Sequence, residues 1–230
     1  MRRQNRGRKT LRWAVVLVGA VGTMGVLQGC IIGTAIGGMA ESARRTGSTE
    51  FPADYSGLQG KSYAVVVAVD RLTQAQHPGL VARLTSGVND RLAHPENGVG
   101  ASAFIPSVDL LNVLYQTPQW PAMPPGEVAE MLGVERLIMV ELFDYQLHEA
   151  GNRYVWNGVA AGAVTLYESD SGIPDDPVYE RSIRVTFPDG TGFMAADIPQ
   201  SGVTSELSRR FINRVAWLFY VHEEPNTIAY

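Results

Sequence analysis

Cysteine is almost absent from this chain of 230 residues, which contains only Cys30. A single thiol cannot form an intrachain disulfide, and it cannot supply the several cysteine ligands of a structural zinc site. The fold must therefore be stabilised by its hydrophobic core, without covalent or metal crosslinks.

Basic residues are scarce beyond Cys30. The whole chain has 19 lysines and arginines against 23 aspartates and glutamates, and six of the basic residues, but no acidic one, precede the cysteine. The rest of the chain therefore carries 13 against 23, a formal net charge of −10. This balance argues against nucleic acid as a partner, because phosphates need a basic face, and against electrostatic adhesion to anionic lipid.

Long hydrophobic runs are missing as well. The longest, Trp13 to Leu27, has about fifteen apolar or small residues, which falls short of the roughly 20 that a transmembrane helix needs. A positive head that contains Arg2, Arg3 and Lys9 precedes it. A positive head followed by a short apolar core is typical of a signal peptide, which we expect to span residues 1–29.

The sequence Val26-Leu27-Gln28-Gly29-Cys30 resembles the lipobox of bacterial lipoprotein precursors. The resemblance implies cleavage between Gly29 and Cys30, and acyl chains such as palmitate on the thiol and new amine of Cys30. Each buried methylene contributes about 0.8 kcal/mol, so several chains hold a protein durably where one would exchange. The alternatives are an uncleaved membrane anchor and an ordinary secreted protein with a chance cysteine.

The usual signatures of enzymes and metalloproteins are also lacking. The chain contains no GxxxxGK[ST], GxSxG or HExxH motif, and Gly98 to Ala103 fits GxGxxA but precedes a predicted strand, the wrong context for dinucleotide binding. An acidic turn could attract calcium, but its spacing is not that of a calcium loop; its acidic residues are Glu168, Asp170, Asp175 and Asp176. The four histidines are scattered near predicted element ends, where we expect surface or capping roles; they are His77, His94, His148 and His222. We therefore predict no catalytic, cofactor-binding or metal-binding residue.

The remaining chain divides into three parts. Residues 30–61 show no sustained apolar period and are expected to form an acylated cysteine followed by a flexible tether. Gly33 to Gly37 fits the GxxxG pattern of closely packed membrane helices, but the segment that contains it is too short to span a membrane. Residues 62–222 are expected to form one α/β domain, and residues 223–230 a short tail.

The first half of the expected domain alternates strands and helices. Tyr63 to Val69 is β-branched without alternation, which indicates a central strand covered on both faces. Apolar residues at spacings of three and four predict a helix from Leu80 to Leu92. These elements are followed by a short strand at 103–105, a helix capped by Ser107 and a proline-rich loop at 117–125. A helix ended by Gly133 and a strand from Arg136 to Leu147 complete this half.

The second half predicts an antiparallel hairpin and a closing helix. The strands cover 154–167 and 178–187, and Gly158 and Gly162 are expected to mark a bulge or a close neighbour. The helix should run from Val203 to Leu218, capped by Thr204 or Ser205 and ended by Pro225. The predicted fold class is α/β (α+β), with a single mixed sheet flanked by helices.

This order of elements is similar to the small α/β domain in the amino-terminal part of TolB and in the envelope lipoproteins CsgG and LpoB. Two segments carry the resemblance: Phe104-Ile105-Pro106 followed by 127–140, and the strand–turn–strand of 163–180. The resemblance implies a module that docks other envelope proteins and is no enzyme. A CsgG-like pore would need lipid-facing alternation, which this chain lacks.

Three tryptophans are candidate docking anchors, because aromatic residues dominate interface hot spots. Trp217 lies in the closing helix and is expected to be core, whereas Trp156 lies near the start of the predicted hairpin. Trp120 lies in the proline-rich loop, where burial is harder, and is the preferred partner contact.

The sequence therefore predicts a lipid-anchored, non-enzymatic envelope protein. Ile31 stands after the cysteine in place of aspartate, which by analogy with enterobacterial sorting favours the outer membrane, facing the periplasm. The partner is an unknown envelope protein, and a homo-oligomer built through sheet edges stays open. The rival function is a small hydrolase or a ligand-binding protein on the same anchor.

Overall fold

The computed structural model of the protein describes residues 47–190 and 192–226. The predicted signal peptide, Gly29 and Cys30 lie outside these residues. The larger compact unit contains residues 50–224. Among the described helices, none combines the length and the hydropathy required to cross a bilayer.

A five-stranded mixed sheet forms the centre of this unit, in the order β3-β2-β4-β5-β6. β2 (Ser62–Val69) pairs in parallel with β3 (Ala103–Phe104) on one side and with β4 (Arg136–Gln146) on the other. β4, β5 (Gly158–Glu168) and β6 (Pro177–Phe187) then pair antiparallel. The predicted mixed sheet with a hairpin is confirmed.

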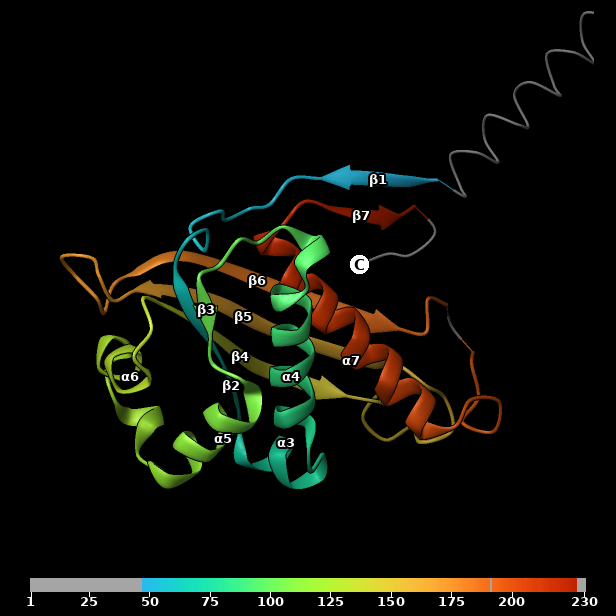
Figure 1. The fold of residues 1–230 in the computed structure, drawn as a ribbon. Coiled ribbons are helices and arrows are strands. Elements are labelled where there is room, and N and C mark those ends of the chain that lie inside the picture. The colour runs from blue at the N-terminus through green and yellow to red at the C-terminus, as the bar shows by residue number, and fades with distance from the viewer. Residues whose placement is uncertain (1–46, 191, 227–230) are drawn as a thin grey trace, which may run out of the picture. The chain divides into compact units, whose positions relative to one another are not determined.

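Two helices cover one face of the sheet, as Figure 1 shows. They are α4 (Leu80–Ala93) and α7 (Gln200–Ala216). The apolar face predicted for α4 packs on Val65 and Val67 of β2, and Phe211 of α7 lies in the same core cluster. This cluster is the larger of the two cores of the unit.

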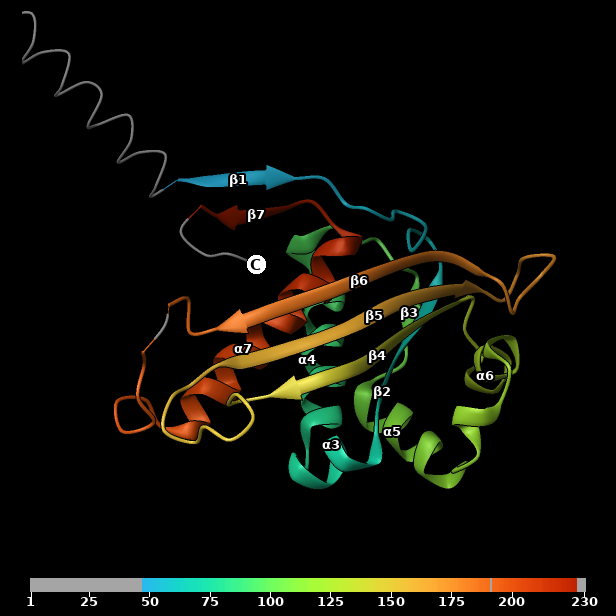
Figure 2. The same ribbon diagram turned by 180° about the vertical axis from the view of Figure 1, so that it is seen from behind.

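A smaller core lies on the opposite face. There α5 (Ser107–Gln116) and α6 (Pro125–Leu132) pack Leu110 and Val128 against Ala64 and Val66. Successive residues of β2 thus enter alternate cores, which explains its unbroken apolar sequence and confirms its central position. On this face, which is turned toward the viewer in Figure 2, α6 reaches the end of β5, and none of the described helices lies over β6.

Residues 50–61, which the sequence assigns to the end of the tether, belong to the folded unit. Leu58 is buried in the larger core. The backbone N–H of Tyr55 donates to the carbonyl of Leu218 at 2.9 Å. These contacts place the start of the folded unit earlier than residue 62.

The sheet count differs from the prediction of a single sheet. β1 (Ser48–Phe51) and β7 (His222–Pro225) form a separate two-stranded sheet. The expected tail from residue 223 therefore contains strand residues. β7 is short and its residues are at most half-buried, so it has no apolar pattern from which a strand could be predicted.

The helix ends differ from the predicted caps. Ser107 accepts from the side-chain amide of Asn89 at 3.1 Å and makes no capping bond, because Pro106 occupies the N-cap position. Helix α7 starts at Gln200 after Pro199, ahead of the expected caps Thr204 and Ser205. It ends at Ala216 and continues as the 3-10 helix η3 (Trp217–Phe219), well before Pro225.

Remaining connections include the short helix α3 (Arg71–Gln76) and two 3-10 turns, η1 (Pro95–Asn97) and η2 (Trp120–Ala122). Gly133 ends α6 with a φ of 67°, in the left-handed conformation that the sequence predicts. Helix α3 connects the end of β2 to α4, so it lies at the carboxyl end of the parallel strands.

Candidate functional site

Trp120 is placed in the 3-10 turn η2 within the proline-rich loop. Its backbone N–H donates to Thr117 and its carbonyl accepts from Met123, which folds the loop back on itself. The indole is half-buried and packs against the smaller core. Trp120 therefore has a structural role in addition to the contact role, which stays a prediction.

A cleft of about 630 Å³ lies beside Trp120, at the carboxyl end of β2. Its walls come from β2, α3, α4, α5 and η2. In sheets with parallel strands, ligands commonly bind at the carboxyl ends of the strands. The apolar part of the lining includes Val69, Val81, Leu111, Tyr115, Pro118 and Trp120.

Tyr115 is the most exposed large apolar side chain of the cleft, with 88% of its surface open to solvent. It lies near the end of α5, four residues after Leu111, so both line the cleft from the same helix face. Leu72 and Val108 are also exposed, at 67% and 71%, on the neighbouring helices α3 and α5. Exposed apolar groups gathered beside a cleft are typical of interaction surfaces.

The charged groups of the cleft are Asp70 and Arg71. The Asp70 carboxylate caps α3, where it accepts from the N–H groups of Leu72 at 2.8 Å and Thr73 at 3.0 Å. The hydrogen bonds from Thr73 hold the pKa of this carboxyl below its usual value. Asp70 is therefore occupied as a helix cap and is poorly suited to act as a general base.

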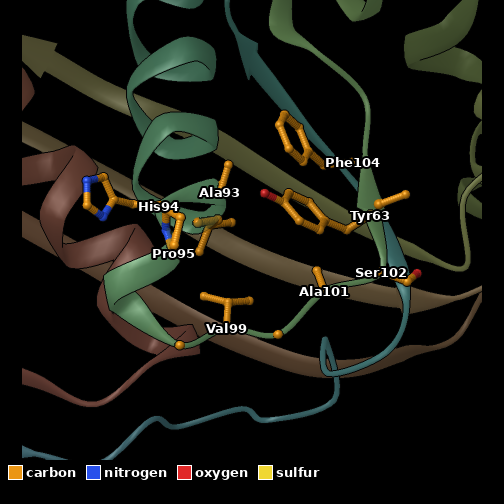
Figure 3. A pocket seen from close by; sticks show the side chains of 12 residues that line it. Tyr63, Ala93, His94, Pro95, Val99, Ala101, Ser102 and Phe104 are labelled. Atoms are coloured by element: carbon orange, nitrogen blue, oxygen red, sulfur yellow. The ribbon is translucent and has the colours of Figure 1, made fainter.

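A second cavity of about 520 Å³ is formed by the loop that fits GxGxxA (Figure 3). The loop leads from η1 into β3, so it lacks the strand-to-helix turn of a dinucleotide site. Tyr63 is fully buried beside it, and its hydroxyl has no hydrogen-bond partner among the described residues. Burial raises the pKa of the Tyr63 phenol.

The acidic turn after β5 is used for internal ion pairs. Asp170 pairs with Lys61 at 2.6 Å and with the buried guanidinium of Arg136, and hydrogen bonds from these two cations lower its pKa. Glu168 also reaches Arg136 and accepts from the Tyr55 hydroxyl at 2.8 Å. These bonds fasten the segment before β2 to the sheet.

Asp175, another acidic residue of this turn, also makes an internal hydrogen bond. The Asp175 carboxylate accepts from the N–H of Gly126 at 2.8 Å, at the start of α6. Within residues 47–190 and 192–226, no group of three histidine, cysteine or acidic side chains is arranged to hold a metal ion.

The histidines pack against aromatic rings more than surface or capping roles would suggest. His148 stacks on Trp156 with 4.2 Å between ring centroids, and His222 stacks on Trp217 at 4.6 Å. His77 contacts the Tyr145 ring edge-on at 4.7 Å, and burial lowers its pKa. His94, in contrast, is exposed as expected.

The other two candidate tryptophans are buried. Trp217 is 8% exposed in η3, which confirms the expectation that it belongs to the core. Trp156 is 4% exposed, and its indole N–H donates to the carbonyl of Ile198 at 2.9 Å. Neither is available as a docking anchor in this conformation.

Comparison with known proteins gives weakly similar solved structures but no family. No family model and no curated protein matches the sequence. Lipoprotein GNA1162 from Neisseria meningitidis is 13% identical, with a TM-score of 0.40 over 67% of this chain and 97% of the other. A PelC dodecamer from Paraburkholderia phytofirmans is 13% identical, with a TM-score of 0.40 over 76% and 97%.

A third solved structure, hypothetical protein CT253 from Chlamydia trachomatis, is 13% identical, with a TM-score of 0.38 over 68% of this chain and 98% of the other. Scores of this size do not establish a shared function. The resemblance to TolB, CsgG and LpoB therefore stays a prediction, and this chain is similar to solved bacterial proteins without an assigned family.

Proposed function

We propose that this protein is a lipid-anchored envelope protein that docks another envelope protein through the apolar cleft beside Trp120. In this proposal, acyl chains on Cys30 anchor the protein in the membrane. The residues between Cys30 and about residue 50 tether the α/β unit to this anchor, and the α/β unit contacts the partner. The observation that carries the proposal is the open apolar cleft, with Tyr115 88% exposed at its rim.

The chemistry of the cleft favours an apolar segment of a basic partner. Its wall is mainly aliphatic and aromatic, which suits insertion of apolar side chains. The chain beyond the signal peptide carries a formal net charge of −10, which would speed encounter with a positively charged protein. The capped Asp70 supports docking over catalysis in this cleft.

Site-specific photocrosslinking in the native envelope tests the proposal. A photoreactive phenylalanine analogue replaces Tyr115 in the cleft, and the same analogue replaces Tyr154, an exposed tyrosine at 78% in the loop before β5, as the matched control. We expect a discrete adduct with another envelope protein from position 115 and none from position 154. Equal adducts from both positions, or none from either, would contradict the proposal.

A ligand-binding function is the second candidate, and one observation favours it. The buried Tyr63 hydroxyl lies beside the 520 Å³ cavity without a described partner, and buried phenols usually have one. A small molecule that binds there should raise the melting temperature of the protein, and Tyr63→Phe should abolish that rise while the folded protein keeps its own stability.

A further inference from the structure

Strand β2 has an unpaired stretch of edge beyond the end of β3. β3 pairs only with Ser62 and Tyr63 of β2, whereas β2 continues to Val69, toward α3 and α5 (Figure 1). After β3 the chain leaves the sheet at Pro106 and enters α5. On this side, no described strand pairs with the second half of β2. β2 is thus flanked by two strands over its first residues and by β4 alone over its last ones.

The free backbone groups of this edge belong to Val67 and Val69. The carbonyl of Tyr63 accepts from the N–H of Ile105 at 3.2 Å, which shows that Tyr63 directs its backbone groups to the β3 side. Alternate residues of a strand direct their N–H and C=O groups to the same side. Those of Val67 and Val69 therefore point away from β4, and they make no hydrogen bond within the described part of the chain. Such groups are a template for another strand.

The cleft beside Trp120 lies along this edge. Three consecutive residues of β2 line it, Val67, Ala68 and Val69. Neighbouring side chains of a strand point to opposite faces, so a cleft that contacts all three lies at the side of the strand and not over one face. β4, on the other side of β2, contributes no residue to the lining. The unpaired groups of β2 therefore border the proposed docking site.

The walls of the cleft come from the layers on the two faces of the sheet. Leu114 and Trp120 belong to the side of the smaller core, whereas Val81 of α4 packs against the larger core. The space between these walls therefore continues the line of the sheet. Its volume of about 630 Å³ lies within the range of about 300–1,000 Å³ that is common for ligand sites. A short extended segment of a few residues suits this space.

Resting on the docking function proposed above, we infer that the partner binds as an extended segment that adds a short strand to β2. Its backbone bonds the free groups of Val67 and Val69, in the line that β3 leaves open. Because its side chains alternate, every second one enters the apolar wall of Leu114 and Trp120, and those between face Val81. In strand addition, main-chain hydrogen bonds give affinity and alternate side chains give specificity. The partner segment therefore has apolar residues at alternate positions.

Hydrogen exchange of the unbound chain tests whether the edge is open. The N–H groups of Val67 and Val69 should exchange at least about tenfold faster than those of Val66 and Ala68, which point to β4. NMR of the isotope-labelled, full-length chain in detergent measures each amide separately. Equal protection at the four positions overturns the inference, because the edge would then be closed within the chain.

Proline at position 69 tests the binding mode in the native envelope. Proline is tolerated on a strand edge whose N–H has no partner in the fold, but it removes a donor that an added strand needs. In the chain with the photoreactive analogue at position 115, Val69→Pro should reduce the adduct roughly tenfold or more. Arg71→Pro is the matched control, because proline is tolerated at the first position of a helix such as α3. It leaves the free groups of β2 unchanged, so the adduct should persist.

The outcomes separate this inference from the docking proposal. Loss of the adduct in Val69→Pro alone, at an unchanged melting temperature, supports strand addition. An adduct that persists in Val69→Pro, or that both variants reduce equally, overturns strand addition but leaves docking at the cleft in place, as for a partner that binds as a helix. No adduct from position 115 of the original chain, or an adduct of two copies of this chain, overturns both. If Val69→Pro fails to fold, the exchange rates of the original chain decide.

Discussion

Arg136 lies at the start of β4 with its guanidinium buried, 7% exposed, between Asp170 and Glu168. Its Nε also donates to the Gly57 carbonyl at 3.2 Å, so it connects the segment before β2 to the sheet. Arg136→Ala removes the shared cation of Asp170 and Glu168, which then keep only Lys61 and the Tyr55 hydroxyl as described partners. Loss of hydrogen bonds to charged groups should destabilise the protein by about 1.5–3 kcal/mol. Urea unfolding measures this loss. Arg83→Ala, at an exposed position on α4, should stay within about 0.5 kcal/mol; similar losses in both variants would refute the role of Arg136.

Asp189 gives the protein an acid-sensitive ion pair. Its carboxylate is bound by the buried Arg210 guanidinium, with 2.6 Å between Nη2 and Oδ2, and that hydrogen bond lowers the pKa of Asp189. A carboxyl group with a pKa lowered in the folded state adds stability above its unfolded pKa of about 3.9, and this stability is lost as pH falls through the folded value. The free energy of unfolding should therefore fall below about pH 4, and fall less steeply in Asp189→Asn. Parallel pH profiles would contradict this assignment.

Single residues were predicted well where burial follows from local pattern. Trp217 was expected in the core because it lies in the closing amphipathic helix, and the structure buries it. Trp120 is only half exposed because its loop folds back on the smaller core. This long-range contact cannot be predicted from local apolar periodicity. The pairing of Arg136 with Asp170 joins residues 34 positions apart, so the acidic turn could not be assigned a structural role from sequence.

The contact between β4 and β5 depends on glycine at position 162. A Cβ there would lie 2.5 Å from the carbonyl oxygen of Glu141 and 3.1 Å from the Phe211 ring, next to the irregular register between Leu142 and Asp144. Gly162→Ala should destabilise the protein by about 1–3 kcal/mol, because backbone must move to admit the methyl group. Gly172→Ala, which has nothing within 4 Å, is the matched control. Equal melting temperatures for the two variants would disprove the close approach.

Elements were predicted best where apolar periodicity spans several turns or strand residues. The apolar faces of β2 and α4 and the close packing at the glycines of β5 were predicted from local sequence alone. The start of α7 at Gln200 was missed because its first turn has no apolar residue before Val203. The contribution of residues 50–61 was missed because the few apolar residues of this segment follow no sustained period, and the burial of Leu58 depends on the tertiary fold.

Sorting within the envelope is a property of the whole molecule. We expect Ile31, the residue after Cys30, to permit transfer to the outer membrane. Ile31→Asp should then shift the protein to the inner membrane fraction, by analogy with enterobacterial sorting, while the stability of the α/β unit stays unchanged. Separation of the two membranes by density, with immunodetection, measures the shift; identical distributions of both forms would contradict the outer-membrane assignment.

The account as a whole requires that acyl chains on Cys30 hold this acidic α/β unit at the membrane. Mass spectrometry of the amino-terminal peptide from the native envelope measures this directly. We predict a peptide that begins at Cys30 and carries the added mass of its acyl chains. A peptide that begins at Met1, or an unmodified Cys30, would contradict the account.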